Sequence, residues 1–199
     1  NTERRHSEYF PQKPFASLPQ AYRDSLFQAT FDPENGLFRT EICSDDYLRF
    51  LTQELKPFID QEFSTLPDKE NTFVAGSSMG GLISMYALCE YPEVFGGAGC
   101  LSTHWVGIFD TLNNPIPQHF VSYLEANLPS PEDHRLYFDY GTATLDALYE
   151  PYQQMVDTVM VAKGYTAANW TTKKFPGAPH TENAWRERLE VPLVFLLGE

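Results

Sequence analysis

The residues best suited to chemistry in this 199-residue chain form the run Gly76-Ser77-Ser78-Met79-Gly80-Gly81. Its Gly-x-Ser-x-Gly pattern is typical of a serine nucleophile, here Ser78, that projects from a sharp turn between a strand and a helix. Glycines on both sides are expected because side chains there would collide with neighbouring backbone. The Met79 amide would open the helix and face the oxyanion formed by attack on a carbonyl. A glycine turn that only packs a helix on a strand is the alternative, and Ser77 lies off the centre of the motif.

A serine nucleophile needs a base to accept its proton and an acid to orient that base. Among five histidines, His180 is the predicted base because it ends a loop of small residues and proline, 176–180, after the last predicted strand. A surface or capping histidine is the alternative. Asp146, after the third predicted strand, is the predicted acid, although it would also suit a helix N-cap. Asp139 and Asp157 are less suitable, since one lies inside a strand and the other inside a helix.

Residues outside the predicted triad could shape a binding pocket. The run Ser102-Thr103-His104-Trp105 follows the second predicted strand, so His104 and Trp105 are expected to wall a pocket for the acyl or alcohol group, with a packed loop as the alternative. A small basic and aromatic group near the start could meet an anionic part of the substrate, but a solvated segment is the favoured interpretation: Arg4, Arg5, Tyr9 and Lys13. A lid or a satellite core is expected from three phenylalanines: Phe27, Phe31 and Phe38.

After residue 70, short apolar stretches alternate with helical periodicity, which predicts a parallel sheet with helices on both faces. The predicted strands are 72–75, 96–101, 135–140 and 170–175, and the predicted helices are 80–90, 115–128, 145–163 and 181–197. Upstream, a helix that begins near Tyr47 is expected to kink at Pro57. Residues 1–46 are expected to be irregular apart from a short helix at 20–28.

Composition disfavours several classes of protein. The net charge of −13 would be repelled by phosphate backbones and anionic lipid, so neither nucleic acid nor a membrane is an expected partner. No stretch approaches the roughly 20 apolar residues that span a bilayer. Cys43, Cys89 and Cys100 are few and widely spaced, which favours free thiols in a reducing compartment, so a cytoplasmic location is expected. No Cys/His cluster has the spacing of metal ligands, and neither a metal nor another cofactor is expected.

These motifs resemble those of the esterase-D-type putative esterase family of α/β hydrolases, which includes feruloyl esterases, S-formylglutathione hydrolases, enterochelin-type siderophore esterases and mycolyltransferases. The resemblance is carried by residues 76–81, Tyr91-Pro92-Glu93-Val94-Phe95, Asp139-Tyr140-Gly141-Thr142 and Pro179-His180-Thr181-Glu182-Asn183-Ala184-Trp185. The last run is similar to the family's histidine loop, with Pro179 in place of glycine. The family's acid commonly lies where this chain has Thr144, so Asp146 would need a slightly longer loop.

The resemblance implies one α/β-hydrolase-type domain over residues 1–199, N-terminally truncated, so that strands usually found before the elbow are absent. The first strand would then be an unpaired edge open to association with another polypeptide, and a second oxyanion amide would come from absent sequence. The implied function is a serine esterase that acts on a small-molecule ester through an acyl-enzyme. An acyltransferase with the same triad and a non-catalytic binding module with a hydrolase fold are the alternatives.

Overall fold

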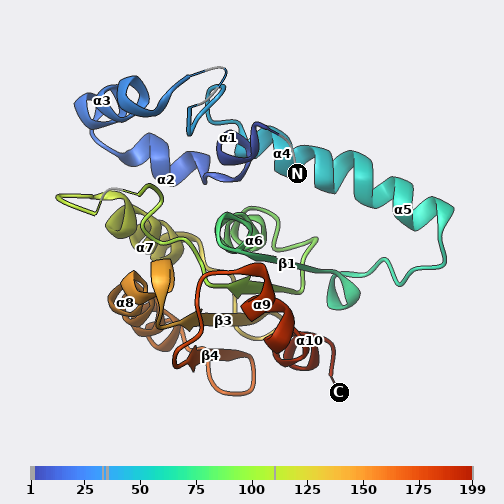
Figure 1. The fold of residues 1–199 in the computed structure, drawn as a ribbon. Helices are drawn as coiled ribbons and strands as arrows, with labels where there is room; N and C mark the ends of the chain where they lie inside the picture. Colours follow the sequence, from blue (N-terminus) through green and yellow to red (C-terminus); the bar gives the residue numbers. More distant parts are fainter. Residues whose placement is uncertain (1–2, 33, 35, 110, 199) are drawn as a thin grey trace.

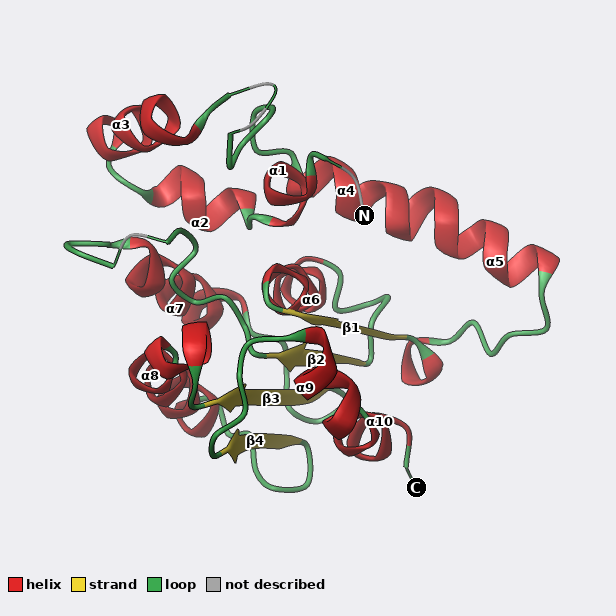
Figure 2. Ribbon diagram, viewed as in Figure 1, coloured by secondary structure: helices red, strands yellow, loops and turns green. Residues whose placement is uncertain are grey.

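The computed structural model describes residues 3–32, 34, 36–109 and 111–198, and its centre is a four-stranded sheet in the order β1-β2-β3-β4 (Figures 1 and 2). The strands are β1 (Phe73–Ser77), β2 (Gly97–Leu101), β3 (Arg135–Gly141) and β4 (Trp170–Phe175). All neighbouring strands pair in parallel. The predicted parallel sheet is therefore confirmed, with small differences at the strand ends.

In the described part of the chain, five α-helices follow the first strand. They are α6 (Met79–Glu90), α7 (Ile116–Asn127), α8 (Glu150–Ala162), α9 (Glu182–Arg188) and α10 (Glu190–Leu197). A 3-10 helix, η3 (Thr144–Leu148), lies between β3 and α8. The helix expected at 145–163 is thus divided into η3 and α8, and the one expected at 181–197 into α9 and α10.

Helices cover both faces of the sheet because successive strand residues point to opposite sides. Cys100 and its register partner Phe138 face the side of α6 and α8. Their neighbours Gly99 and Tyr137 face α10 on the other side, where a Cβ at Gly99 would lie 3.2 Å from a methyl carbon of Leu196. The small residues of β2 therefore let α10 pack closely on the sheet.

The N-terminal part of the chain is more helical than the sequence indicates. Its elements are α1 (Arg5–Tyr9), α2 (Gln12–Ser17), α3 (Gln20–Thr30), α4 (Ser44–Phe50), the π-helical turn η1 (Leu51–Leu55), α5 (Lys56–Glu62) and the 3-10 turn η2 (Lys69–Asn71). The expectation of irregular structure before residue 20 is wrong, since α1 and α2 are too short to show a helical repeat and depend on tertiary packing. Phe10 at the end of α1 is fully buried against Phe38 and Phe120.

Of the three upstream phenylalanines, Phe38 belongs to the core and Phe27 packs against it, whereas Phe31 is exposed, so the cluster is closer to the satellite core than to a lid. Phe27 stacks on Phe31 with ring centroids 4.7 Å apart and also stacks on Phe38. Phe38 in turn meets Phe10, so this cluster continues into the main core. The N-terminal helices are therefore anchored to the rest of the domain by aromatic packing.

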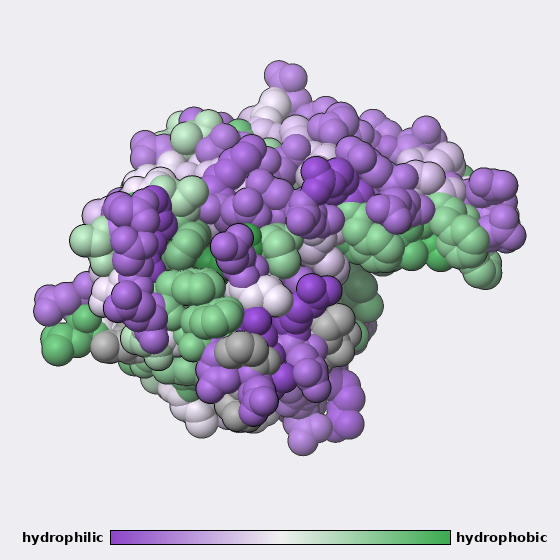
Figure 3. Space-filling view, turned by 90° about the horizontal axis from the view of Figure 1, so that it is seen from above, coloured by the Kyte–Doolittle hydropathy of each residue, from purple (hydrophilic) through white to green (hydrophobic). Residues whose placement is uncertain are grey.

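The kink expected at Pro57 is absent. Pro57 lies in the first turn of α5, directly after η1, and the ribbon runs on from α4 to α5 as one projecting arm (Figure 1). Proline has no N–H to donate, and it is tolerated in the first turn of a helix, which is where Pro57 lies as the π-helical pattern of η1 changes to the α-helical pattern of α5. Figure 3, which looks down on this arm, shows a band of hydrophobic residues along it, and Leu55, Phe58 and Phe63 are exposed there.

The strand β1 lies at one edge of the described sheet, where β2 is its partner on the inner side. The expected association with another polypeptide would use the outer side of β1. Association itself stays a prediction, as does a single domain over residues 1–199. Within the described ranges, no helix is both long and apolar enough to cross a membrane, and Cys43, Cys89 and Cys100 form no disulfide.

Tyr86 links α6 to the N-terminal helices and provides a test of their docking. Its fully buried hydroxyl donates to Asp45 Oδ1 at 2.5 Å and accepts from the Lys13 amide at 3.3 Å. We expect Tyr86→Phe to lower the free energy of unfolding by about 1–3 kcal/mol, because it leaves both partners without this hydrogen bond. Urea denaturation measures the change. Tyr152→Phe is the matched control, since its hydroxyl has no hydrogen bond to a described residue, and an equal loss in both variants would contradict the prediction.

Candidate active site

The turn between β1 and α6 holds Ser78 in a backbone conformation that few residues other than glycine adopt, with φ 60° and ψ −119°. Its N–H donates to the Leu101 carbonyl at 2.9 Å, and its carbonyl accepts from the amides of Gly81 at 3.0 Å and His104 at 3.3 Å. Contacts from α6 and from the end of β2 thus fix the strained turn, as expected for a nucleophile elbow.

The two glycines of the motif have different reasons to be there. A Cβ at Gly76 would lie 2.7–2.8 Å from the backbone of Gly80, which cannot yield without opening the turn. A Cβ at Gly80 would meet no described atom within 4 Å outside the adjoining backbone of its own helix. The expectation that a side chain at Gly80 would itself collide with backbone is therefore wrong, because this position faces open space and only its backbone approaches β1.

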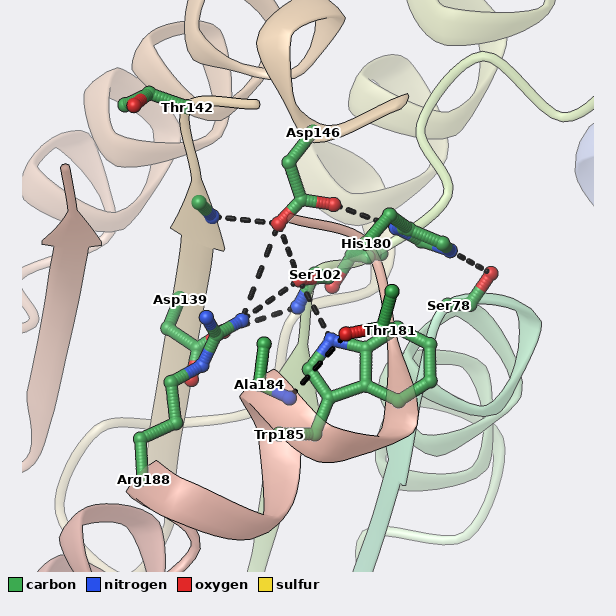
Figure 4. A network of polar contacts seen from close by, with 12 residues as sticks. Ser78, Ser102, Asp139, Thr142, Asp146, His180, Thr181, Ala184, Trp185 and Arg188 are labelled. Carbon is green, nitrogen blue, oxygen red and sulfur yellow. Dashed lines mark hydrogen bonds and ion pairs between the residues drawn. The ribbon is translucent and has the colours of Figure 1, made fainter. Parts of the chain in front are cut away.

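The structure brings the predicted nucleophile, base and acid together (Figure 4). Ser78 Oγ lies 2.9 Å from His180 Nε2, and His180 Nδ1 lies 2.5 Å from Asp146 Oδ1. The Ser78 side chain follows β1, Asp146 follows β3 and His180 follows β4. All three therefore lie at the carboxyl ends of parallel strands, which meet at one edge of the sheet.

The loop that carries His180 is tied at several points. The His180 amide donates to Thr144 Oγ1 at 2.8 Å, and the His180 ring packs edge-on against Trp185 with ring centroids 4.9 Å apart. The next residue, Thr181, caps α9 by accepting from the Ala184 amide at 3.3 Å. The imidazole is thus held between the helix start and η3. Thr144, the residue at the family's usual acid position, serves here as an anchor for the histidine loop.

Asp146 lies in η3 with no exposure to water, and its carboxylate is fully engaged. Besides His180 it accepts from the Gly141 amide at 2.5 Å and from Ser102 Oγ at 2.6 Å. Burial alone would raise the pKa of this carboxyl, but the hydrogen bonds from His180, Ser102 and Gly141 outweigh it and hold the pKa below its ordinary value. The oxygens are not used for a helix N-cap, so that alternative is wrong.

The other two aspartates are used elsewhere. Asp139 is buried and accepts from Arg188, the Ser102 amide and Tyr137, and burial raises its pKa while Arg188 opposes the rise. Asp157 accepts from side chains of α8 and β4. Neither contacts His180, so Asp146 is the carboxylate of the triad geometry.

A buried network behind Asp146 has no counterpart in the sequence analysis (Figure 4). Ser102 Oγ accepts from Trp185 Nε1 at 2.9 Å and from Arg188 Nη2 at 2.8 Å while it donates to Asp146. The same Arg188 nitrogen donates to Asp139, and the guanidinium lies 4.7 Å from the centre of the Phe175 ring. Since two donors fill the acceptor capacity of the Ser102 oxygen, its single proton points to Asp146.

A signal for this network was present in the spacing of Trp185 and Arg188. Residues three apart share one face of a helix, so both had to point the same way from α9. What the sequence does not indicate is that this face meets Ser102, which lies 86 positions from Arg188.

A cavity of about 570 Å³ opens at Ser78 and His180. His104 lines it, with Nδ1 2.8 Å from the Tyr149 hydroxyl. Burial, with smaller contributions from the positive charges of His180, His6 and Arg5, lowers the pKa of His104 to about 3. This imidazole is therefore neutral near pH 7 and can form a hydrogen bond within the cavity.

Trp105 does not line the cavity, which corrects the expectation that it walls the pocket. Its side chain is 1% exposed, its Nε1 donates to Gln153 Oε1 at 3.0 Å and its ring lies against Phe138. The loop after β2 thus turns His104 to the cavity and Trp105 to the core between the sheet and α8. The packed-loop alternative holds for Trp105.

The backbone amide of Met79 is positioned to donate a hydrogen bond to an anion. Met79 is the first residue of α6, where amides have no acceptor inside the helix and the helix dipole is positive. A metal has no corresponding site: in the part of the chain that the structure describes, no group of three or more His, Cys, Asp or Glu residues could hold one. The arrangement can move a proton from a hydroxyl to an imidazole and stabilise a neighbouring oxyanion.

Comparison with known proteins identifies the family of this chain. The model of the family described as Putative esterase matches residues 39–196. The chain is 31% identical over 101 residues to ferri-bacillibactin esterase BesA of Bacillus subtilis (48% of this chain and 30% of that protein). It is 29% identical over 142 residues to carboxylesterase SOBER1 of Arabidopsis thaliana (71% and 61%).

Solved structures show the same fold. An enterobactin esterase from Shigella flexneri, in the presence of 2,3-Di-hydroxy-N-benzoyl-serine, superposes with a TM-score of 0.61 at 22% identity, over 77% of this chain and 38% of that one. This likeness supports the α/β-hydrolase type of fold, with a parallel sheet and helices on both faces. The chain spans less than two thirds of the length of each of these three proteins.

Exchanging each motif glycine for alanine tests the close approach at the elbow. We expect Gly76→Ala to lower the free energy of unfolding by about 1–3 kcal/mol, because its Cβ overlaps the backbone of Gly80. Gly80→Ala is expected to change it by less than about 1 kcal/mol, since the new methyl meets open space in the first turn of a helix. Thermal or urea denaturation compares the two. Equal destabilisation would refute the assigned contact.

Removing the Ser102 hydroxyl tests the support of Asp146. At pH 7 we expect Ser102→Ala to lower the free energy of unfolding by about 1–3 kcal/mol, because a carboxylate loses a donor and Trp185 and Arg188 lose an acceptor. Asp146 has a lowered pKa, so its hydrogen bonds contribute above the unfolded pKa of about 3.9 and fade as pH falls through the folded one. The loss should therefore be smaller near pH 3.

Urea denaturation at both pH values measures this difference. Ser84→Ala is the matched control, because the buried Ser84 hydroxyl donates only to the Gly80 carbonyl and its loss should not depend on Asp146. A Ser102→Ala loss that is the same at both pH values would argue against an ionised Asp146 as its main partner.

Proposed function

This chain belongs to the Putative esterase family, and from that premise we propose that it hydrolyses carboxylic esters through a Ser78-His180-Asp146 triad and an acyl-enzyme intermediate. One observation supports the proposal above all: an unbroken series of hydrogen bonds runs from Ser78 Oγ through His180 to Asp146, at 2.9 Å and 2.5 Å. That geometry matches a nucleophile, a base and an orienting acid.

In the acylation step, Ser78 Oγ attacks the ester carbonyl carbon while His180 Nε2 takes the hydroxyl proton. The carbonyl oxygen becomes an oxyanion and accepts a hydrogen bond from the Met79 amide at the start of α6. The intermediate then collapses, the alkoxide leaves, and His180 returns the proton to it. The products of this step are an alcohol and the acyl group esterified to Ser78.

In the deacylation step, water takes the place of the alcohol. The water oxygen attacks the acyl carbon while His180 accepts a proton from the water. The Ser78 oxygen then leaves the acyl group and recovers that proton from His180. Asp146 remains ionised throughout, in keeping with its lowered pKa, and stabilises the imidazolium that forms in both steps. Neither step needs a metal ion or an organic cofactor.

The cavity fits a small-molecule ester. Its volume of about 570 Å³ lies within the roughly 300–1,000 Å³ of ordinary ligand pockets. Its lining combines apolar groups from α6, among them Ile83 and Ala87, with the polar groups around Ser78. A purely non-catalytic module would have no need for the strained Ser78 backbone, which supports an enzyme over that alternative.

A serine-directed probe tests the nucleophile. We expect a fluorophosphonate to label the full-length protein and not Ser78→Ala, and we expect this substitution to lower kcat for a p-nitrophenyl ester by at least about 1,000-fold. Ser77→Ala is the matched control: its hydroxyl makes no hydrogen bond to His180 among the described contacts, so labelling should persist. Labelling and hydrolysis that survive in Ser78→Ala would refute the proposed nucleophile.

A further inference from the structure

Part of the cavity wall is built by α1 and α4. Arg5, His6 and Tyr9 come from α1 and Tyr47 comes from α4, and all of them line the same cavity as Ser78. Sequence analysis favours a solvated segment for this basic and aromatic group. The structure instead turns part of it toward the reactive centre.

Arg5 and Arg4 are neighbours in sequence but have different surroundings. Arg4 is 59% exposed along its side chain and pairs with Glu8 at 3.6 Å, and it does not line the cavity. Arg5 is half-buried, and its guanidinium lies 5.9 Å from the centre of the Tyr9 ring. Among the described residues, no carboxylate forms an ion pair with Arg5, and it is the only Arg or Lys in the described cavity lining.

The groups beside Arg5 are uncharged hydrogen-bonding partners. Burial and the adjacent Arg5 charge lower the pKa of His6, and burial together with Tyr9 raises the pKa of Tyr47 well above its usual range. The hydroxyls of Tyr9 and Tyr47 lie 3.5 Å apart, and their rings are tilted against each other. Near pH 7 this wall therefore offers one fixed positive charge with phenol groups next to it.

The negative charge at the cavity comes from other elements. Glu182 lines it from α9, next to Trp185, and Asp146 is sealed behind His180 with no exposure. Burial is the main cause of the lowered pKa of His104, and the Arg5 charge adds to it from across the cavity. A chain with a net charge of −13 thus presents a positive end inside its own reactive cavity.

Resting on the esterase function above, we propose that the cavity selects esters that carry a carboxylate, which the Arg5 guanidinium receives beside Tyr9 and Tyr47 while the ester carbonyl lies at Ser78. The half-buried Arg5 guanidinium lies over the Tyr9 ring and, among the described residues, has no anionic partner for its N–H donors. A carboxylate would accept charge-assisted hydrogen bonds from these donors, for which the planar guanidinium is well suited. The Tyr9 and Tyr47 hydroxyls next to it could donate further hydrogen bonds to that carboxylate.

Matched esters test the selection with the full-length protein. The charged substrate is p-nitrophenyl hemiglutarate, and the uncharged one is its methyl ester. We expect Arg5→Met to lower kcat/KM for the charged ester by roughly tenfold or more, as for the loss of a hydrogen bond to a charged group, and to leave the uncharged ester within about twofold. Arg4→Met removes the same charge outside the cavity and should change neither ratio.

Two kinetic results would overturn the inference. One is an equal loss for both esters in Arg5→Met, which would mean that Arg5 only supports the fold. The other is an equal effect of Arg4→Met and Arg5→Met, which would mean that net charge alone attracts the substrate.

A binding measurement separates this inference from the proposed hydrolysis. In the Ser78→Ala background, calorimetry with phenylacetate and uncharged phenylacetamide needs no turnover. Preferential binding of phenylacetate that Arg5→Met removes and Arg4→Met retains would support the inference even if no ester were hydrolysed. Equal binding of the two compounds would overturn it, whereas hydrolysis that does not depend on Ser78 would overturn the proposed function alone.

Discussion

The buried carboxylate of Asp146 is the constraint on which the site depends. A carboxylate without water must have its oxygens filled by donors, and here His180, Ser102 and the Gly141 amide fill them. Arg188 does not pair closely with Asp146, since its Nη2 lies 3.9 Å from Oδ2, and instead fixes the direction of the Ser102 hydroxyl. In the proposed mechanism, the positive charge that balances Asp146 would therefore be the one that forms on the His180 imidazole.

The sequence was sufficient to predict that the three residues of the site come together. Ser78, Asp146 and His180 each follow a strand of a parallel sheet, and parallel strands deliver their carboxyl ends to one edge. Gly-x-Ser-x-Gly could be assigned to an elbow because a strand pattern precedes it and a helix pattern follows it. Short local patterns therefore predicted most of the fold after residue 70 and all three residues of the triad geometry.

What the sequence could not indicate depends on contacts between distant segments. The short helices α1 and α2 have too few residues to show a repeat, yet aromatic packing at Phe10 stabilises them. His104 and Trp105 are adjacent in sequence and turn to opposite sides of one loop, which only the packing of α8 decides. The orientation of Arg5 toward the cavity likewise depends on where α1 docks, and composition near the chain start carries no such information.

The wide separation of the three groups along the chain has a consequence for the protein while it is being made. A ribosome adds residues in order, so a nascent chain that extends through α8 already contains the elbow and Asp146 but has no base for Ser78. In the proposed mechanism, the Ser78 hydroxyl would therefore lack its base until β4 and the loop with His180 have emerged and docked. Ester hydrolysis by this triad would begin only after that loop has docked.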